Sequence, residues 1–245
     1  MRNLKKIICL VVSSIILDLP IIFGQNLSDG GFRQSFERLD SALLAKLTLN
    51  SSPLRSGKEN YSTIEGDPYL YGDFATGEVI LKTGEKIPLW LRFNIYTRVV
   101  QFRQDDEIYV LLNKGSVSSV LIDSLRFIYT SYLKSADDEN SKANTWFILK
   151  KDGKLKLLVM KNLRIQPGEN PRAYQSPTMP KFISMADSYY LEPEGKSAIR
   201  IESKKDLLAL FADKSSAVMQ FMDANKLGVK KAKHLTKILE YYNTL

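Results

Sequence analysis

His234 is the only histidine among the 245 residues, and Cys9 is the only cysteine. A Ser-His-Asp triad would have to use His234, yet no G-x-S-x-G turn marks a nucleophilic serine. Zinc sites recruit several histidine or cysteine ligands, which this chain does not offer. We therefore expect His234 to be a partly exposed surface residue, with no triad and no zinc site.

Oxygen ligands and phosphate-binding loops lead to the same expectation. Asp137-Asp138-Glu139-Asn140 gathers several oxygen atoms in one loop, but it lacks the alternate spacing of an EF-hand and is typical of a solvated loop. Gly30-Gly31 follows no predicted strand, and no G-x-x-x-x-G-K-[ST] motif occurs. The sequence therefore assigns no catalytic, cofactor-binding or metal-binding residue and predicts no cofactor.

A hydrolase that uses two carboxylates is the alternative that these exclusions leave open. Such enzymes need only an Asp or Glu pair at the correct separation in a cleft. The proline-rich loop at 166–180 is the expected lining of that cleft, since long irregular loops often carry function. Sequence spacing within a β meander does not select the pair, so whether the chain is an enzyme stays open, with binding favoured.

Aromatic and polar side chains supply the one candidate binding surface. Trp90, Arg92 and Asn94 alternate with apolar residues on a predicted strand, and Tyr174 lies in the proline-rich loop. If that strand face is solvated, these residues form a surface for a protein or glycan. If helices cover it, Trp90 is a core residue.

These residues are expected to be held by an antiparallel sheet at 69–202. Short alternating runs are separated by the turns Thr83-Gly84-Glu85 and Asp152-Gly153, which is a hairpin signature. We predict an α+β fold, with the strands in a meander that forms a half-barrel or a sandwich-like sheet. An N-terminal helix precedes the strands, and three short helices follow them.

The predicted helices lie at both ends of the chain. Phe32, Phe36, Leu39, Leu43 and Leu47 form one apolar stripe within an amphipathic helix at 25–49, and turn formers at 50–68 indicate a linker. At 203–245 the apolar period becomes 3.6, and this helical region is expected to pack on the sheet. Ser203 and Asp206 form a capping-box pattern there, and Gly228 is expected to allow the turn after the second helix.

The first 24 residues read as a secretory signal peptide. Arg2, Lys5 and Lys6 precede an apolar run that Asp18 and Pro20 interrupt, which is too short for a membrane span of about 20 residues. We expect cleavage after Gly24, no transmembrane span afterwards, and a periplasmic, outer-membrane-associated or extracellular location. The chain is basic, with a formal net charge of +8, but no nucleic-acid recognition motif is present.

Two blocks of the sequence resemble an exported protein family of Bacteroidota whose activity is uncharacterised. The first contains Tyr69-Leu70-Tyr71-Gly72-Asp73-Phe74 and Leu91-Arg92-Phe93-Asn94-Ile95-Tyr96, and the second runs from Lys205-Asp206-Leu207-Leu208 to Tyr241-Tyr242-Asn243. The resemblance implies a cell-envelope setting and carries no catalytic residue. Together with the missing catalytic motifs, it favours a non-enzymatic binding or assembly module for a protein or glycan partner.

Overall fold

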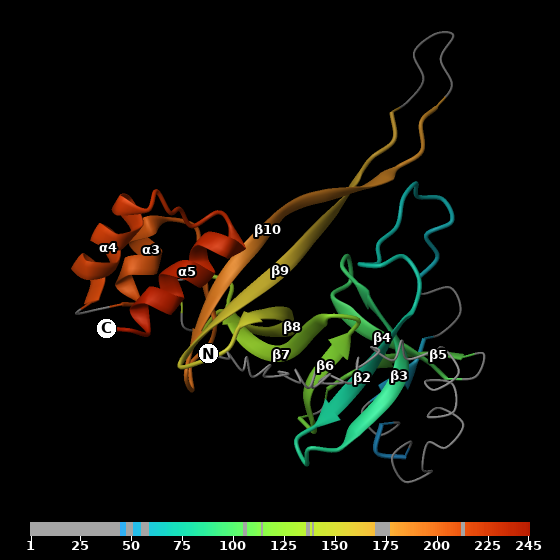
Figure 1. Cartoon of the computed structure of the whole chain (residues 1–245). Helices are drawn as coiled ribbons and strands as arrows, with labels where there is room; N and C mark the ends of the chain where they lie inside the picture. The colour runs from blue at the N-terminus through green and yellow to red at the C-terminus, as the bar shows by residue number, and fades with distance from the viewer. Residues whose placement is uncertain are drawn as a thin grey trace, which may run out of the picture.

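Figure 1 shows the chain as a computed structural model, which describes residues 45–47, 51–54, 59–104, 107–113, 115–135, 138, 140–169, 177–211 and 214–245. The predicted signal peptide at 1–24 and Tyr174 lie outside these residues. Of the predicted helix at 25–49, residues 45–47 are described, and they are helical. Leu47 is 1% exposed and joins the core of the sheet. No helix in the described ranges is long and apolar enough to cross a membrane.

An open antiparallel sheet of eleven strands forms most of the fold, in the order β1-β5-β4-β3-β2-β6-β7-β8-β9-β10-β11. The strands are β1 Ser51–Pro53, β2 Ala75–Leu81, β3 Lys86–Asn94, β4 Val99–Gln104, β5 Glu107–Leu111, β6 Val117–Ile122, β7 Leu125–Leu133, β8 Lys142–Lys151, β9 Leu155–Gln166, β10 Lys181–Pro193 and β11 Ile199–Ile201. Three short helices follow, α3 Lys204–Ala209, α4 Ser215–Ala224 and α5 Ala232–Tyr242. The predicted antiparallel sheet with short helices after it is confirmed.

The hairpins form where the turn residues predicted them. β2 and β3 are joined around Gly84, and β8 and β9 around Gly153. Both glycines have positive φ angles, +87° and +146°, which a side chain would disfavour. Local turn chemistry therefore sets the register of these two hairpins.

The first hydrophobic core lies on one face of the N-terminal strands. On β3 the alternate residues Ile87, Leu89, Leu91 and Phe93 are all buried. They pack with apolar side chains from β2, β4 and β6, and Phe127, Trp146 and Val159 extend this core onto β7, β8 and β9. The first core is therefore shared by strands from β2 to β9.

The second core lies between the helices and the C-terminal strands. Leu157 of β9 and Leu191 of β10 face Leu207, Phe211 and Leu235 of the helical region, and all five are fully buried. The Ser203–Asp206 capping box that starts α3 is present, as predicted. The helical region at 203–245 thus packs on the sheet at the end where β9 begins.

A third cluster fills the opposite face of the C-terminal strands. The rings of Tyr132, Phe147 and Tyr190 meet edge to face, with centroids 5.0 to 5.7 Å apart. An isolated parallel bridge pairs Tyr132 of β7 with Ala198, the residue before β11. The sheet therefore curls back far enough for its last strand to meet β7 around these rings.

The turn between α4 and α5 differs from the prediction. Gly228 was expected to permit this turn, but the residue with a left-handed backbone is Lys226, at φ 52°. The amide of Leu227 donates to the carbonyl of Met222 at 2.8 Å, which closes the end of α4. The left-handed position therefore comes two residues earlier than the glycine suggested.

Candidate binding surface and projecting arm

The predicted surface residues of β3 lie on the face opposite the first core, and residues 59–74 cover that face. Arg92 is sandwiched between two rings, with its guanidinium carbon 3.8 Å from the centre of Tyr69 and 4.3 Å from that of Phe74. Arg103 of β4 lies 5.1 Å from the Phe74 ring and 5.9 Å from that of Trp90. The sequence left open whether this face is solvated or covered by helices, and the structure covers it with an irregular segment.

Beneath this covering segment, Asn94 and Gln101 form a buried polar network. Both are fully buried. Gln101 donates to Glu59 at 2.6 Å and accepts from Arg92 Nε at 2.7 Å. Asn94 donates to the hydroxyl of Tyr61 at 3.1 Å. The buried side chains of the sheet thus find their hydrogen-bond partners in Glu59 and Tyr61, and these bonds hold the covering segment to the sheet.

Tyr69 is the titratable group that this network perturbs most. Burial raises the pKa of Tyr69 to about 12, with Arg92 lowering it and Glu59 raising it further. The phenol is protonated at neutral pH, as an ordinary tyrosine is, and it donates to Glu59 at 3.3 Å. Tyr69 acts here as a structural hydrogen-bond donor, which is the opposite of an activated tyrosine.

An aromatic cluster extends from the covering segment to β10. The ring of Phe182 lies 5.4 Å from that of Tyr61 and 5.6 Å from that of Tyr96. Beside them, the amide of Phe182 donates to the carbonyl of Glu65 at 2.9 Å, and the amide of Glu65 donates to the carbonyl of Pro180 at 2.8 Å. These contacts brace β10 against residues 59–66.

β9 and β10 reach this brace as a two-stranded arm that leaves the rest of the sheet (Figure 1), because Phe182 pairs with Ile165 and Lys181 with Gln166 at the end of the ribbon. β8 pairs with β9 no farther than Val159, whereas β10 accompanies β9 to Gln166. The arm thus extends about 23 Å past the last pairing with β8. Along 160–166, the outer edge of β9 makes no backbone hydrogen bond with any residue that the structure describes.

The two terminal strands of the sheet are better protected. β1 has three residues and includes Pro53, which cannot donate to a further strand. β11 also has three residues, and Ala198 before it is bridged to β7. Natural sheets commonly shorten or block their edges in these ways. The arm therefore carries the longest open strand edge among the described strands, along 160–166 of β9, and the outer edge of β10 is also unpaired between Phe182 and Tyr189.

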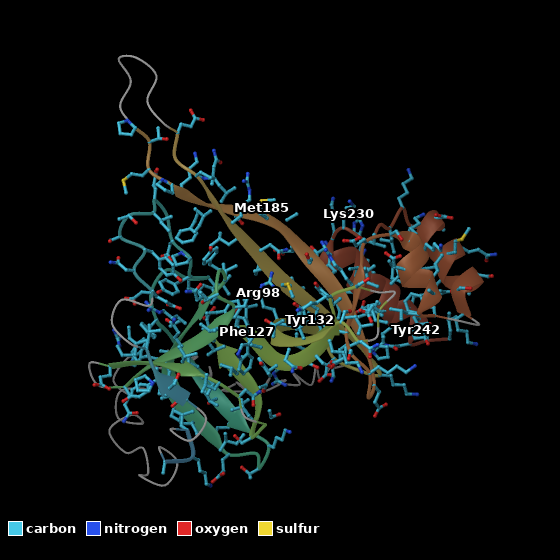
Figure 2. All side chains as sticks on the ribbon, turned by 180° about the vertical axis from the view of Figure 1, so that it is seen from behind. Arg98, Phe127, Tyr132, Met185, Lys230 and Tyr242 are labelled. Carbon is cyan, nitrogen blue, oxygen red and sulfur yellow. The ribbon has the colours of Figure 1, made fainter. Side chains whose placement is uncertain are left out.

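The side chains of the arm are apolar and cationic. Leu163 and Ile165 alternate with Arg164 on β9. On the return strand Met185 is 46% exposed, and Met179 near the tip is 52% exposed (Met185 is labelled in Figure 2). Lys161 is paired with Asp187 at 2.9 Å, which leaves Arg164 as the cation in the middle of the open edge. The sequence predicts an antiparallel sheet here, but alternation along the chain did not show that β9 outruns β8.

His234 lies on α5 and contacts the turn before it. His234 is half-buried, and its Nδ1 accepts the amide proton of Gly228 at 3.1 Å, so it stabilises the α4–α5 turn.

Asp187 and Glu202 line one hollow of about 390 Å³. Each is bound by its own cation, Lys161 at 2.9 Å and Arg200 at 3.0 Å. This hollow offers no pair of uncommitted carboxylates.

Comparison with known proteins finds no family model, no curated protein and no solved structure that matches this chain.

Proposed function

We propose that this chain is a non-enzymatic binding module of the cell envelope, which engages a partner protein by adding one of the partner's strands to β9. The observation that carries the proposal is the open edge of β9 along 160–166, beyond its last pairing with β8. Strand addition uses the backbone groups of such an edge for affinity and the alternating side chains for specificity. The exported location is inferred from the signal-peptide pattern at residues 1–24.

The brace at the far end of the arm supports this role, because it holds β10 where Lys181 pairs with Gln166. A two-stranded ribbon is marginally stable in water on its own. The Tyr61–Phe182–Tyr96 cluster and the bridge from Glu65 to Lys181 fix the ribbon before any partner arrives. A preformed edge binds with a smaller loss of conformational entropy than a disordered one.

The side chains of β9 specify the kind of strand that fits. Leu163 and Ile165 share one face of the arm, where they would pack best against apolar or β-branched residues of the added strand. Arg164 points to the other face, where a partner carboxylate would form the favourable cross-strand pair. The expected partner segment is thus an extended strand with an acidic residue between two apolar ones.

Site-specific crosslinking tests the proposal. A photo-crosslinking amino acid replaces Ile165 in the full-length chain, and the matched control carries it in place of Met219, which is 49% exposed on α4. We expect a partner adduct in envelope extracts from position 165 and none from position 219. In the purified complex, the amides of 160–166 should gain protection from hydrogen exchange.

Three outcomes would contradict the proposal. Equal adducts at both positions would show that the arm has no selective role. An adduct at 165 without added amide protection would exclude strand addition. An adduct between two copies of this chain would show self-association in place of a partner protein.

A further inference from the structure

Five lysines form a basic patch on the helical region, at Lys226, Lys230, Lys231, Lys233 and Lys237. All five are exposed, and the sequence contains no acidic residue between Asp223 and Glu240. Lys230 is labelled on this region in Figure 2. The basic patch is therefore a dense cationic surface that the fold orders at one end of the molecule.

Neighbouring acidic residues do not neutralise the basic patch. Asp223 is bound to Lys204 at 2.6 Å, and Glu240 to Lys151 at 3.3 Å. None of the five lysines of the patch forms an ion pair with a residue in the described ranges. The surrounding protein thus leaves this charge available to a ligand.

Lys226 has a left-handed backbone conformation, which is unfavourable for a lysine. Its φ angle of 52° lies in the left-handed region, which costs an L-residue roughly 1 to 2 kcal/mol and which glycine adopts freely. Helices commonly end with glycine at this position. A lysine here is a local conflict that stability alone does not explain.

The start of α5 is a second conflict. Lys230, Lys231 and Lys233 surround its N-terminus, where the helix dipole disfavours positive charge, and its first turn has no acidic residue. Lys233 and Lys237 then lie one turn apart on the same face, a like-charge pair that destabilises a helix. Residues that are locally unfavourable but share one property, here positive charge, are typical of functional surfaces.

We propose that the basic patch binds a linear anionic polysaccharide. α5 buries its apolar face, formed by Leu235, Ile238 and Leu239, in its own core. It therefore has no apolar face to insert into a bilayer, as membrane-surface helices do. The rings of Phe221 and Tyr241 stack on each other with centroids 4.1 Å apart, so they are not free platforms for nucleic-acid bases.

The basic patch and the arm lie at opposite ends of the β9–β10 hairpin (Figure 1). Leu155, at the start of β9, packs in the helical core, and Gln166 ends β9 on the arm, about 36 Å away. A protein partner on the arm and a polysaccharide on the helices would therefore not compete. The polysaccharide assignment stands apart from the strand-addition proposal, and either can fail alone.

Retention on immobilised heparin, a sulfated polysaccharide, tests the assignment with the full-length chain. One variant combines Lys226→Gln, Lys233→Gln and Lys237→Gln. The matched control combines Lys82→Gln, Lys134→Gln and Lys150→Gln, three exposed lysines elsewhere. Both lose the same net charge, so any difference reports position. We expect the patch variant to bind heparin on the order of 100-fold more weakly at low salt and the control to change little.

Two results would overturn the assignment. Equal weakening in both variants would show a general effect of net charge. Binding to vesicles of phosphatidylcholine and phosphatidylserine without retention on heparin would show that the patch recognises a membrane surface. Urea unfolding of each variant verifies that the fold is intact before either comparison.

Discussion

Replacing Lys226 with glycine should make this protein more stable. The left-handed backbone at φ 52° costs an L-residue roughly 1 to 2 kcal/mol, whereas glycine adopts it without strain. Glycine returns part of that gain through its larger conformational entropy in the unfolded chain, roughly 0.5 to 1 kcal/mol. The expected net increase in the free energy of unfolding is about 0.5 to 1 kcal/mol.

Lys226→Ala separates backbone strain from charge. Alanine removes the same positive charge but keeps a Cβ atom, so it retains the left-handed strain. Urea unfolding monitored by circular dichroism should rank glycine above both alanine and lysine. Thermal unfolding should show an increase in Tm of about 2 to 4 °C for each kcal/mol. Equal stabilities of the glycine and alanine variants would refute the strain argument, because only the backbone distinguishes them.

The same pair of variants relates stability to binding. Both should lose the contribution of Lys226 to heparin retention equally, since both lack its ammonium group. Lys226→Gly would then be more stable and bind more weakly, the exchange expected when a strained residue is kept for function. A glycine variant that retained full heparin affinity would show that Lys226 takes no part in the basic patch.

Further predictions concern the sheet and the helices. Gly77→Ala should destabilise the protein by about 3 kcal/mol, because a Cβ there would lie 2.2 Å from the carbonyl oxygen of Leu121 and 2.8 Å from Leu91 Cδ1. Gly228→Ala, with no neighbouring atom within 4 Å, is its control, and equal losses in urea unfolding would contradict the steric cause. Asp206→Ala should cost about 1 kcal/mol at pH 7 through loss of the cap of α3. Burial tends to raise the pKa of Asp206, but hydrogen bonds from the Glu202 and Ser203 amides outweigh it and lower the pKa. This contribution is therefore present above the unfolded pKa of about 3.9 and is lost as the pH falls through the folded value. Unfolding curves of Asp206→Ala and the parent chain should converge below about pH 4, and a constant difference down to pH 2 would contradict the role of the carboxylate.

Local signals in the sequence predicted much of the fold. Alternation predicted that one face of β3 is apolar, because a strand directs successive side chains to opposite faces, and Leu89 and Leu91 on that face are buried. Gly84 and Gly153 marked turns because their backbone angles exclude most other residues. In both cases the determining interactions lie within a few residues of one another.

The covering segment and the arm depend on contacts between distant parts of the chain. Glu59 and Gln101 meet across 42 positions, and no periodicity at 50–68 indicates that this stretch folds back over β3. Arg92 lies on the face opposite the first core, but alternation cannot say what covers that face. The open edge of β9 likewise follows from where β8 stops pairing, which depends on the partner strand and not on β9 itself.

The bridge between Tyr132 and Ala198 has a consequence for the order of folding. The chain must be complete through residue 198 before β11 can reach β7, and the neighbouring hydroxyls of Ser131 and Ser197 meet at 2.9 Å across 66 positions. Contacts of such long sequence separation form late, after the local hairpins. A chain truncated before Ala198 would therefore expose an unprotected strand and the rings beside it, which are features of aggregation-prone intermediates.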